Sequence, residues 1–93
     1  MVRYKIVATV VSLKGECPNG NKAGDRIQIA REKVTGVKCP TAFNSIYPII
    51  FAMRFGAELP WLKDKDIAVA QCPDPEHCVT FEMRREKEER SQQ

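Results

Sequence analysis

Several motifs that would indicate a reaction are missing from this sequence of 93 residues. It has a single histidine, His77, and no Ser/His/Asp set or paired-carboxylate motif can be assembled. The glycine-rich stretch from Gly15 to Gly24 lacks the Gly-Lys-Ser/Thr ending of a phosphate-binding loop. Aromatic residues make up 8% of the chain, which weakens the case for a surface that stacks single-stranded nucleic acid. The sequence therefore indicates no reaction and no substrate.

Long hydrophobic runs are also scarce. The most apolar stretch, residues 39–56, is interrupted by Pro48 and is shorter than the roughly 20 apolar residues of a membrane helix. The first residues alternate apolar and polar side chains, as a strand does, and do not resemble a secretory signal. We therefore expect a cytoplasmic protein without a membrane partner, in which thiols stay reduced.

The charge is unevenly distributed along the chain. The net charge is +3, but residues 1–55 carry nine Lys/Arg against three Asp/Glu, and residues 56–93 carry six against nine. The basic first half could meet a nucleic acid or an acidic protein, while a solvated surface explains the same pattern without a partner. An interaction module therefore stays open as an alternative function.

One helix is expected between Cys39 and Gly56. Pro40 suits the first helical position after a cap at Cys39, and Gly56 suits the left-handed position after the end. Pro48 predicts a kink, or two abutting short helices. Apolar residues recur at spacings of three and four along this stretch: Ala42, Phe43, Ile46, Tyr47, Ile50, Phe51 and Met53.

Short alternating segments predict strands around this helix. The expected strands are Val2 to Leu13, Asp25 to Arg31, Ile67 to Gln71 and Val79 to Arg85, the last two forming a hairpin. The fold class is thus α+β: a small antiparallel, barrel-like or open, sheet of about four strands with one kinked, proline-interrupted helix packed on it. Residues 1–85 form the single expected domain, and residues 86–93 a charged, frayed tail. A homodimer could form through a sheet edge, and Trp61 could cover the core as a lid.

The cysteines form the most informative local pattern. Three of the four precede proline, and the fourth lies six positions after the third: Cys17, Cys39, Cys72 and Cys78. Proline fixes the backbone so that following N–H groups can point at the sulfur, which stabilises a thiolate. These residues predict a metal site for zinc or iron, with His77 as a substitute ligand. No close C-x₂-C pair supports that site, and small buried cysteines without a role are an alternative.

A reactive thiol is the other alternative. Cys39 at the helix N-terminus faces the positive end of the helix dipole, which favours a thiolate. A thiol-redox protein would use Cys39 with Cys17 or Cys72.

Taken together, the motifs resemble those of a known group of proteins. Five segments carry the likeness: Cys17 to Asp25, Cys39 to Pro48, Phe51 to Gly56, Pro60-Trp61 and Cys72 to Pro75. They resemble a family of small, uncharacterised bacterial and archaeal proteins with repeated Cys-Pro motifs. The resemblance implies a single-domain prokaryotic protein and supplies no reaction. The family pattern does not require a cysteine at position 78, so it favours a three-cysteine site or a thiol role.

The sequence thus predicts a small cysteine-cluster protein that binds a metal through Cys17, Cys39, Cys72 and Cys78, without demonstrable enzymatic activity. The cofactor would be zinc or iron. The thiol-redox protein and the interaction module are the alternatives.

Overall fold

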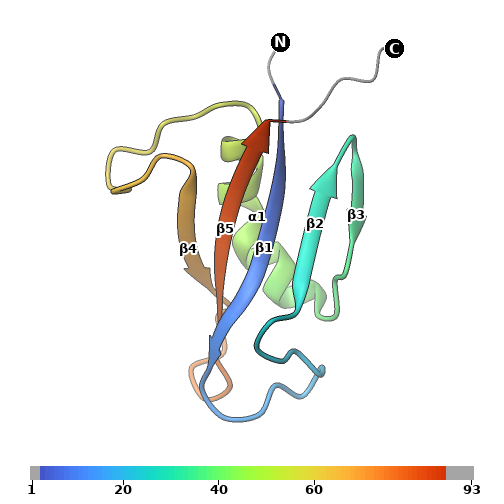
Figure 1. Cartoon of the computed structure of the whole chain (residues 1–93). Coiled ribbons are helices and arrows are strands. Elements are labelled where there is room, and N and C mark those ends of the chain that lie inside the picture. The colour runs from blue at the N-terminus through green and yellow to red at the C-terminus, as the bar shows by residue number, and fades with distance from the viewer. Residues whose placement is uncertain (1–2, 88–93) are drawn as a thin grey trace.

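The chain folds into one antiparallel sheet with a single helix on one face, so the expected α+β class is confirmed (Figure 1). The computed structural model describes residues 3–87. The five strands lie in the order β3-β2-β1-β5-β4, which places the first and last strands side by side in the centre. The elements are β1 (Tyr4–Leu13), β2 (Arg26–Ala30), β3 (Lys33–Thr35), α1 (Pro40–Arg54), β4 (Ile67–Gln71) and β5 (Val79–Lys87).

The sheet differs from the prediction in strand number and in closure. It has five strands, and it is open, so the barrel is wrong: β3 and β4 are two separate edges. The unexpected strand β3 pairs with β2 through a two-residue turn at Arg31 and Glu32, whose φ angles are 53° and 67°. Hairpin turns of this kind are usually marked by Asn-Gly or Asp-Gly. Because that signal is absent here, the hairpin could not be recognised locally.

A β-bulge in β1 decides which side chains reach the core. The register with β5 shifts between Val10 and Ser12, so that Val10 pairs with Phe81 and Ser12 with Thr80. One extra residue reverses the alternation of side chains along a strand. In a regular strand Leu13, three positions after the buried Val10, would face away from the core. Because of the bulge, Leu13 packs against the core and Val11 is half exposed.

The helix begins and ends where the sequence predicts. Cys39 is the N-cap, and Pro40 occupies the first turn. At the other end, the N–H of Gly56 bonds the carbonyl of Met53 (3.2 Å) and that of Ala57 bonds Ala52 (3.1 Å), which is a Schellman ending. α1 runs through Pro48 as one element, so two abutting helices are not formed. Pro48 lies on the exposed side, where water can bond the carbonyl that loses its partner.

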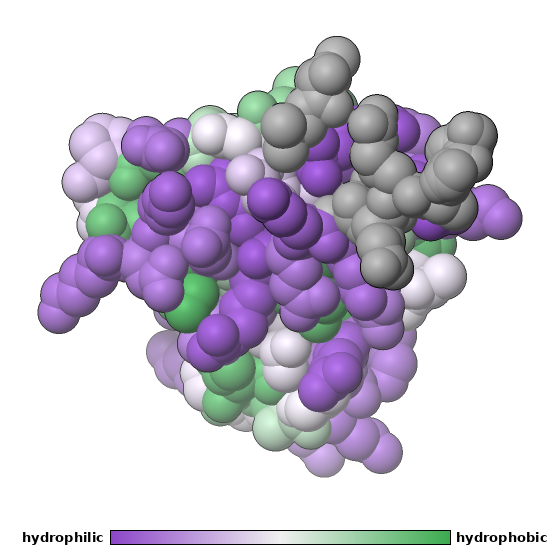
Figure 2. Space-filling model, turned by 45° about the horizontal axis from the view of Figure 1, so that its top comes forward, coloured by the Kyte–Doolittle hydropathy of each residue, from purple (hydrophilic) through white to green (hydrophobic). Residues whose placement is uncertain are grey.

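The core lies between α1 and the sheet. The helix contacts β1, β4 and β5, and Ile46, Ile50 and Met53 are fully buried against the inward residues of the strands. The other face of the sheet carries no helix in Figure 1, and hydrophilic side chains predominate in the view of Figure 2. Half-buried antiparallel sheets commonly show this division.

The last strand extends further than expected. β5 continues through Glu86 to Lys87, two residues beyond the expected end of the domain, and the remaining residues, 88–93, lie outside the described part. Trp61 is 70% exposed and therefore does not cover the core. Among the described residues, no helix is long and apolar enough to cross a membrane.

Candidate functional site

Cys17 begins a tight turn in the loop between β1 and β2. The N–H of Gly20 donates to the Cys17 carbonyl (3.0 Å), with Pro18 in the second position that suits proline. The side chain of Asn21, which is 6% exposed, donates through Nδ2 to the Cys17 sulfur (3.4 Å). The turn therefore directs donors at this sulfur, as the Cys-Pro pattern predicts.

Cys39 lies at the start of α1 and acts as its cap. Its sulfur accepts the N–H of Ala42 at 3.5 Å. The ammonium of the preceding residue, Lys38, binds the carboxylate of Asp25 (2.6 Å) and the carbonyl of Gly20 (3.2 Å). Lys38 thus fastens the loop that carries Cys17 to the segment that carries Cys39.

Cys72 follows β4 and opens the turn of the β4–β5 hairpin. Its sulfur accepts the N–H of Val79 at 3.2 Å, and its own N–H donates to the Val79 carbonyl (3.0 Å). The hydroxyl of Ser45 on α1 donates to the carbonyl of Gln71 (2.9 Å). This bond holds the end of β4, and with it Cys72, near the first half of the helix.

These three cysteines line one cleft at the N-terminal end of α1. The cleft has a volume of about 330 Å³. Its lining includes Cys17, Cys39, Cys72, His77, Asp74 and Asn21. Three segments far apart in the sequence therefore present a thiol to the same space, while Cys78 is not among the residues that line it.

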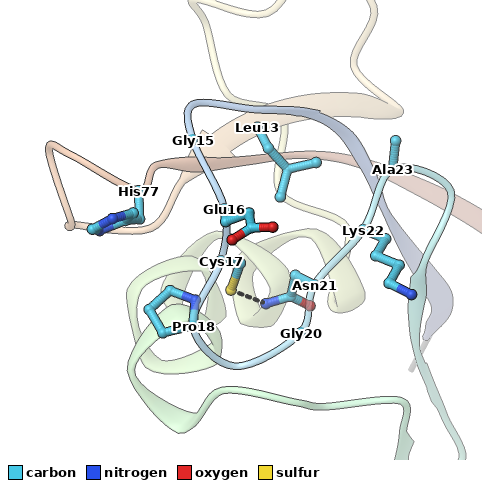
Figure 3. Close-up of a pocket in the computed structure, with 10 residues that line it drawn as sticks. All are labelled: Leu13, Gly15, Glu16, Cys17, Pro18, Gly20, Asn21, Lys22, Ala23 and His77. Atoms are coloured by element: carbon cyan, nitrogen blue, oxygen red, sulfur yellow. Dashed lines mark hydrogen bonds between the residues drawn. The ribbon is translucent and has the colours of Figure 1, made fainter.

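A second, wider hollow adjoins the first through Cys17 (Figure 3). It measures about 720 Å³ and is bordered mainly by the loop of residues 13–23. In Figure 3 the Cys17 sulfur points toward the Asn21 amide, and His77 borders the hollow from the β4–β5 turn with its ring turned away from Cys17. Cys17 is thus the cysteine that both hollows share.

The environment changes the acidity of two thiols in opposite directions. Burial acts to raise the pKa of Cys17, but N–H donors of Asn21, Asn19 and Gly20 together outweigh it, so the pKa lies below the ordinary 9.0. Burial, followed by the neighbouring Cys72 thiol, raises the pKa of Cys78. Cys17 is therefore more readily a thiolate than Cys78.

The sequence reasoning missed two residues that shape this site. Asn21 is a buried donor to Cys17, and no local signal separates it from other loop asparagines. Asp74 accepts the N–H groups of Glu76 (2.9 Å) and His77 (3.1 Å), which lowers the pKa of its carboxyl and shapes the turn. Its Oδ2 also lies 3.3 Å from Nδ1 of His77. An Asp-Pro turn often makes such bonds, so this one could have been anticipated.

Within residues 3–87, no group of three or more His, Cys, Asp or Glu side chains is arranged closely enough to hold a metal ion as it stands. The donor atoms are nevertheless of one kind: three sulfurs, each accepting an N–H group. Thiolates with such donors are the ligands that zinc and iron take in proteins.

Fold and site define a small α+β domain with a thiol-lined cleft at the N-terminus of its helix. Comparison with protein-family models, with curated proteins and with solved structures finds no match to this chain.

Proposed function

We propose that this protein binds a thiophilic metal ion, zinc or iron, through Cys17, Cys39 and Cys72. The observation that carries the proposal is their common cleft: the loop after β1, the start of α1 and the end of β4 each contribute one cysteine. A bound metal would join these segments, and its binding free energy would add to the stability of the fold.

The local backbone supports ligand formation at each position. Every one of the three sulfurs accepts an N–H group, at 3.4, 3.5 and 3.2 Å for Cys17, Cys39 and Cys72. N–H groups of this kind commonly surround the sulfurs of metal-bound cysteines. The positive end of the helix dipole also lies next to Cys39. The site thus offers partial positive charge where the ligand sulfurs carry negative charge.

The proposed ligand set differs from the four cysteines expected from the sequence. Cys78 lies outside the lining of the cleft, and its thiol has a raised pKa. His77 lines the cleft and carries a ring nitrogen, so it is the fourth ligand that we propose. Its Nδ1 lies near Asp74, which leaves Nε2 as the ligating atom.

Cobalt titration of the reduced, metal-free protein tests this proposal. Co²⁺ substitutes for zinc, and cobalt–thiolate charge-transfer absorption reports sulfur ligation directly. We expect one equivalent to bind. Cys17→Ser, Cys39→Ser and Cys72→Ser should each weaken binding by more than about 10-fold, because losing even a residue that only hydrogen-bonds to a ligand typically costs at least that much in metal affinity. Cys78→Ser is the matched control and should bind as the wild type does. Absence of charge-transfer absorption, or equal effects of all four substitutions, would contradict the proposal.

A second candidate is thiol-redox chemistry by Cys39 with Cys17 or Cys72. The observation that favours it is the lowered pKa of Cys17, a thiol that borders both hollows. The thiolate is the attacking species in disulfide exchange, and a lower pKa makes more of it available. This function predicts a disulfide between two cleft cysteines under mild oxidant, which peptide mapping of the non-reduced protein can detect.

A further inference from the structure

The turn that joins β4 to β5 contains two cysteines, Cys72 and Cys78. The thiol of each is directed at the backbone next to the other. The thiol of Cys78 is directed to the carbonyl of Cys72 (3.7 Å), and the thiol of Cys72 to the carbonyl of His77 (3.6 Å), the peptide that precedes Cys78. Each sulfur therefore lies against the backbone of the other cysteine.

The backbone holds the ends of this turn in place. Beyond the last strand pair, Gln71 with Thr80, the N–H of Cys72 still donates to the carbonyl of Val79 (3.0 Å). On the other side, the N–H of Lys14 donates to the carbonyl of Cys78 (2.8 Å). The two cysteines are thus anchored to neighbouring strands at the same end of the sheet, with each thiol directed at the backbone beside the other cysteine.

The interior of the turn is stiff as well. Pro73 and Pro75 each have a fixed φ. Asp74 accepts N–H groups from Glu76 (2.9 Å) and His77 (3.1 Å). A connection with so little freedom loses little entropy when its ends are linked. The remaining cysteines, Cys17 and Cys39, lie on other loops and have no such shared turn.

We propose that Cys72 and Cys78 are a redox pair that a peroxide converts into a disulfide. Cys72 is the attacking residue because it lines the cleft and its sulfur accepts the Val79 N–H, whereas Cys78 lies outside the cleft. The Cys72 thiolate attacks one peroxide oxygen, the O–O bond breaks, and the other oxygen leaves as water or an alcohol after taking a proton. Cys78 then attacks the resulting sulfenic acid, the S–S bond forms, and the S–O bond breaks to release water. The two sulfurs lose two electrons, and the peroxide gains them.

The consequence for the cleft rests on the proposed function. Cys72 is one of the three proposed metal ligands, and a sulfur in a disulfide carries no charge and is a poor ligand. Oxidation would therefore take one ligand from the site and leave Cys17 and Cys39. Cys78 would act as a switch residue: it would bind no metal itself but would decide whether Cys72 is available.

Peptide mapping by mass spectrometry tests the pair in the full-length wild-type protein. The reduced, metal-free protein is treated with one equivalent of hydrogen peroxide, free thiols are alkylated, and the protein is digested without reduction. We expect a Cys72–Cys78 disulfide as the main product, with Cys17 and Cys39 alkylated. Cys39→Ser is the control and should form the same disulfide. A disulfide between cleft cysteines, or sulfinic acid on Cys72 without a disulfide, would overturn the proposal.

Cobalt release tests the consequence separately. Peroxide should abolish cobalt–thiolate absorption in the wild type, and a thiol reductant should restore it. In Cys78→Ala, where no disulfide can form at this turn, restoration by a simple thiol should be incomplete because Cys72, without a partner thiol, continues to sulfinic acid. Full retention of cobalt by protein that carries the Cys72–Cys78 disulfide would overturn the switch. Failure of the reduced protein to bind cobalt would refute the metal site, while the mapping would still decide the redox pair.

Discussion

The two ends of α1 are built in different ways. At the C-terminal end, Arg85 from β5, whose side chain is 2% exposed, donates to the carbonyls of Met53 (3.1 Å) and Ala57 (2.8 Å) and to the carboxylate of Asp66 (2.9 Å). Its guanidinium also lies over the ring of Tyr4, 4.9 Å from the centroid. The carbonyls at this helix end thus meet a buried cation, which also complements the negative end of the dipole.

The N-terminal end of α1 lies beside open space. Its cap is a sulfur at 3.5 Å from the Ala42 N–H, and a cleft of about 330 Å³ separates it from the loops that carry Cys17 and Cys72. No acidic residue lies in the first turn to complement the positive end of the dipole. One end of the helix is therefore closed by strong hydrogen bonds, while the other is left weakly capped and lined with thiols. The comparison indicates that the C-terminal end contributes stability, while the N-terminal end carries the proposed metal site.

The largest expected effect comes from removing the arginine at the closed end. Arg85→Met should lower the free energy of unfolding by about 2–3 kcal/mol, because it leaves two carbonyls and Asp66 without their donor. Urea denaturation measures the change. The control is Arg84→Met on the exposed face of the same strand, which should cost less than about 0.5 kcal/mol. Equal effects of the two substitutions would remove the contrast between the ends.

A smaller effect is expected at the glycine that terminates the helix. Gly56 has a φ of 88°, and the nearest atom to an added Cβ is 3.8 Å away, on the ring of Tyr4. Gly56→Ala should therefore destabilise by about 1 kcal/mol through backbone conformation alone, without a steric clash. Gly56→Asn should cost less, since asparagine tolerates the left-handed region better. A larger loss for asparagine than for alanine in urea denaturation would contradict this explanation.

At the open end, a substitution should have the opposite sign. Serine is a better N-cap than cysteine, so Cys39→Ser should raise the free energy of unfolding of the reduced, metal-free protein by about 0.5 kcal/mol. The same substitution should weaken cobalt binding. Cys39→Ala, which caps no better than cysteine, is the control and should give no gain in urea denaturation. A loss of stability in Cys39→Ser would show that the sulfur is required for packing rather than for binding.

The smallest expected effect concerns the acidity of the thiols. Because the pKa of Cys17 is lowered and that of Cys78 is raised, alkylation of Cys17 should reach half its maximal rate at the lower pH. Iodoacetamide labelling of the metal-free protein from neutral to alkaline pH, followed residue by residue by mass spectrometry, measures both midpoints. Asn21→Ala should shift the Cys17 midpoint upward by removing the Nδ2 donor, and leave that of Cys78 unchanged. The reverse order of the two midpoints would contradict the assignment.

The ion pair between Lys38 and Asp25 should make the open end of the helix sensitive to low pH. The Lys38 ammonium, followed by the Lys22 N–H, lowers the pKa of Asp25 below its ordinary 3.8. A carboxyl whose pKa is lower in the folded than in the unfolded state stabilises the fold at pH values above its unfolded pKa. This stabilisation is lost as the pH falls through its folded-state pKa. Since Lys38 and Asp25 fasten the Cys17 loop to Cys39, acidification below the ordinary range of Asp25 should loosen the open end.

The sequence by itself determined the features that depend on neighbours along the chain. Pro40 and Gly56 bound the helix, alternation marked β1 and β5, and the two-proline turn produced the β4–β5 hairpin, because capping, proline geometry and strand periodicity act within a few residues. The tertiary structure alone decided the bulge that turns Leu13 inward, the edge strand β3 and the open sheet. It also decided which sulfurs share a cleft. The Cys-Pro pattern marked the three cleft cysteines and not Cys78. It could not show that the three meet, since the position of a side chain relative to distant segments depends on long-range packing that no local pattern encodes.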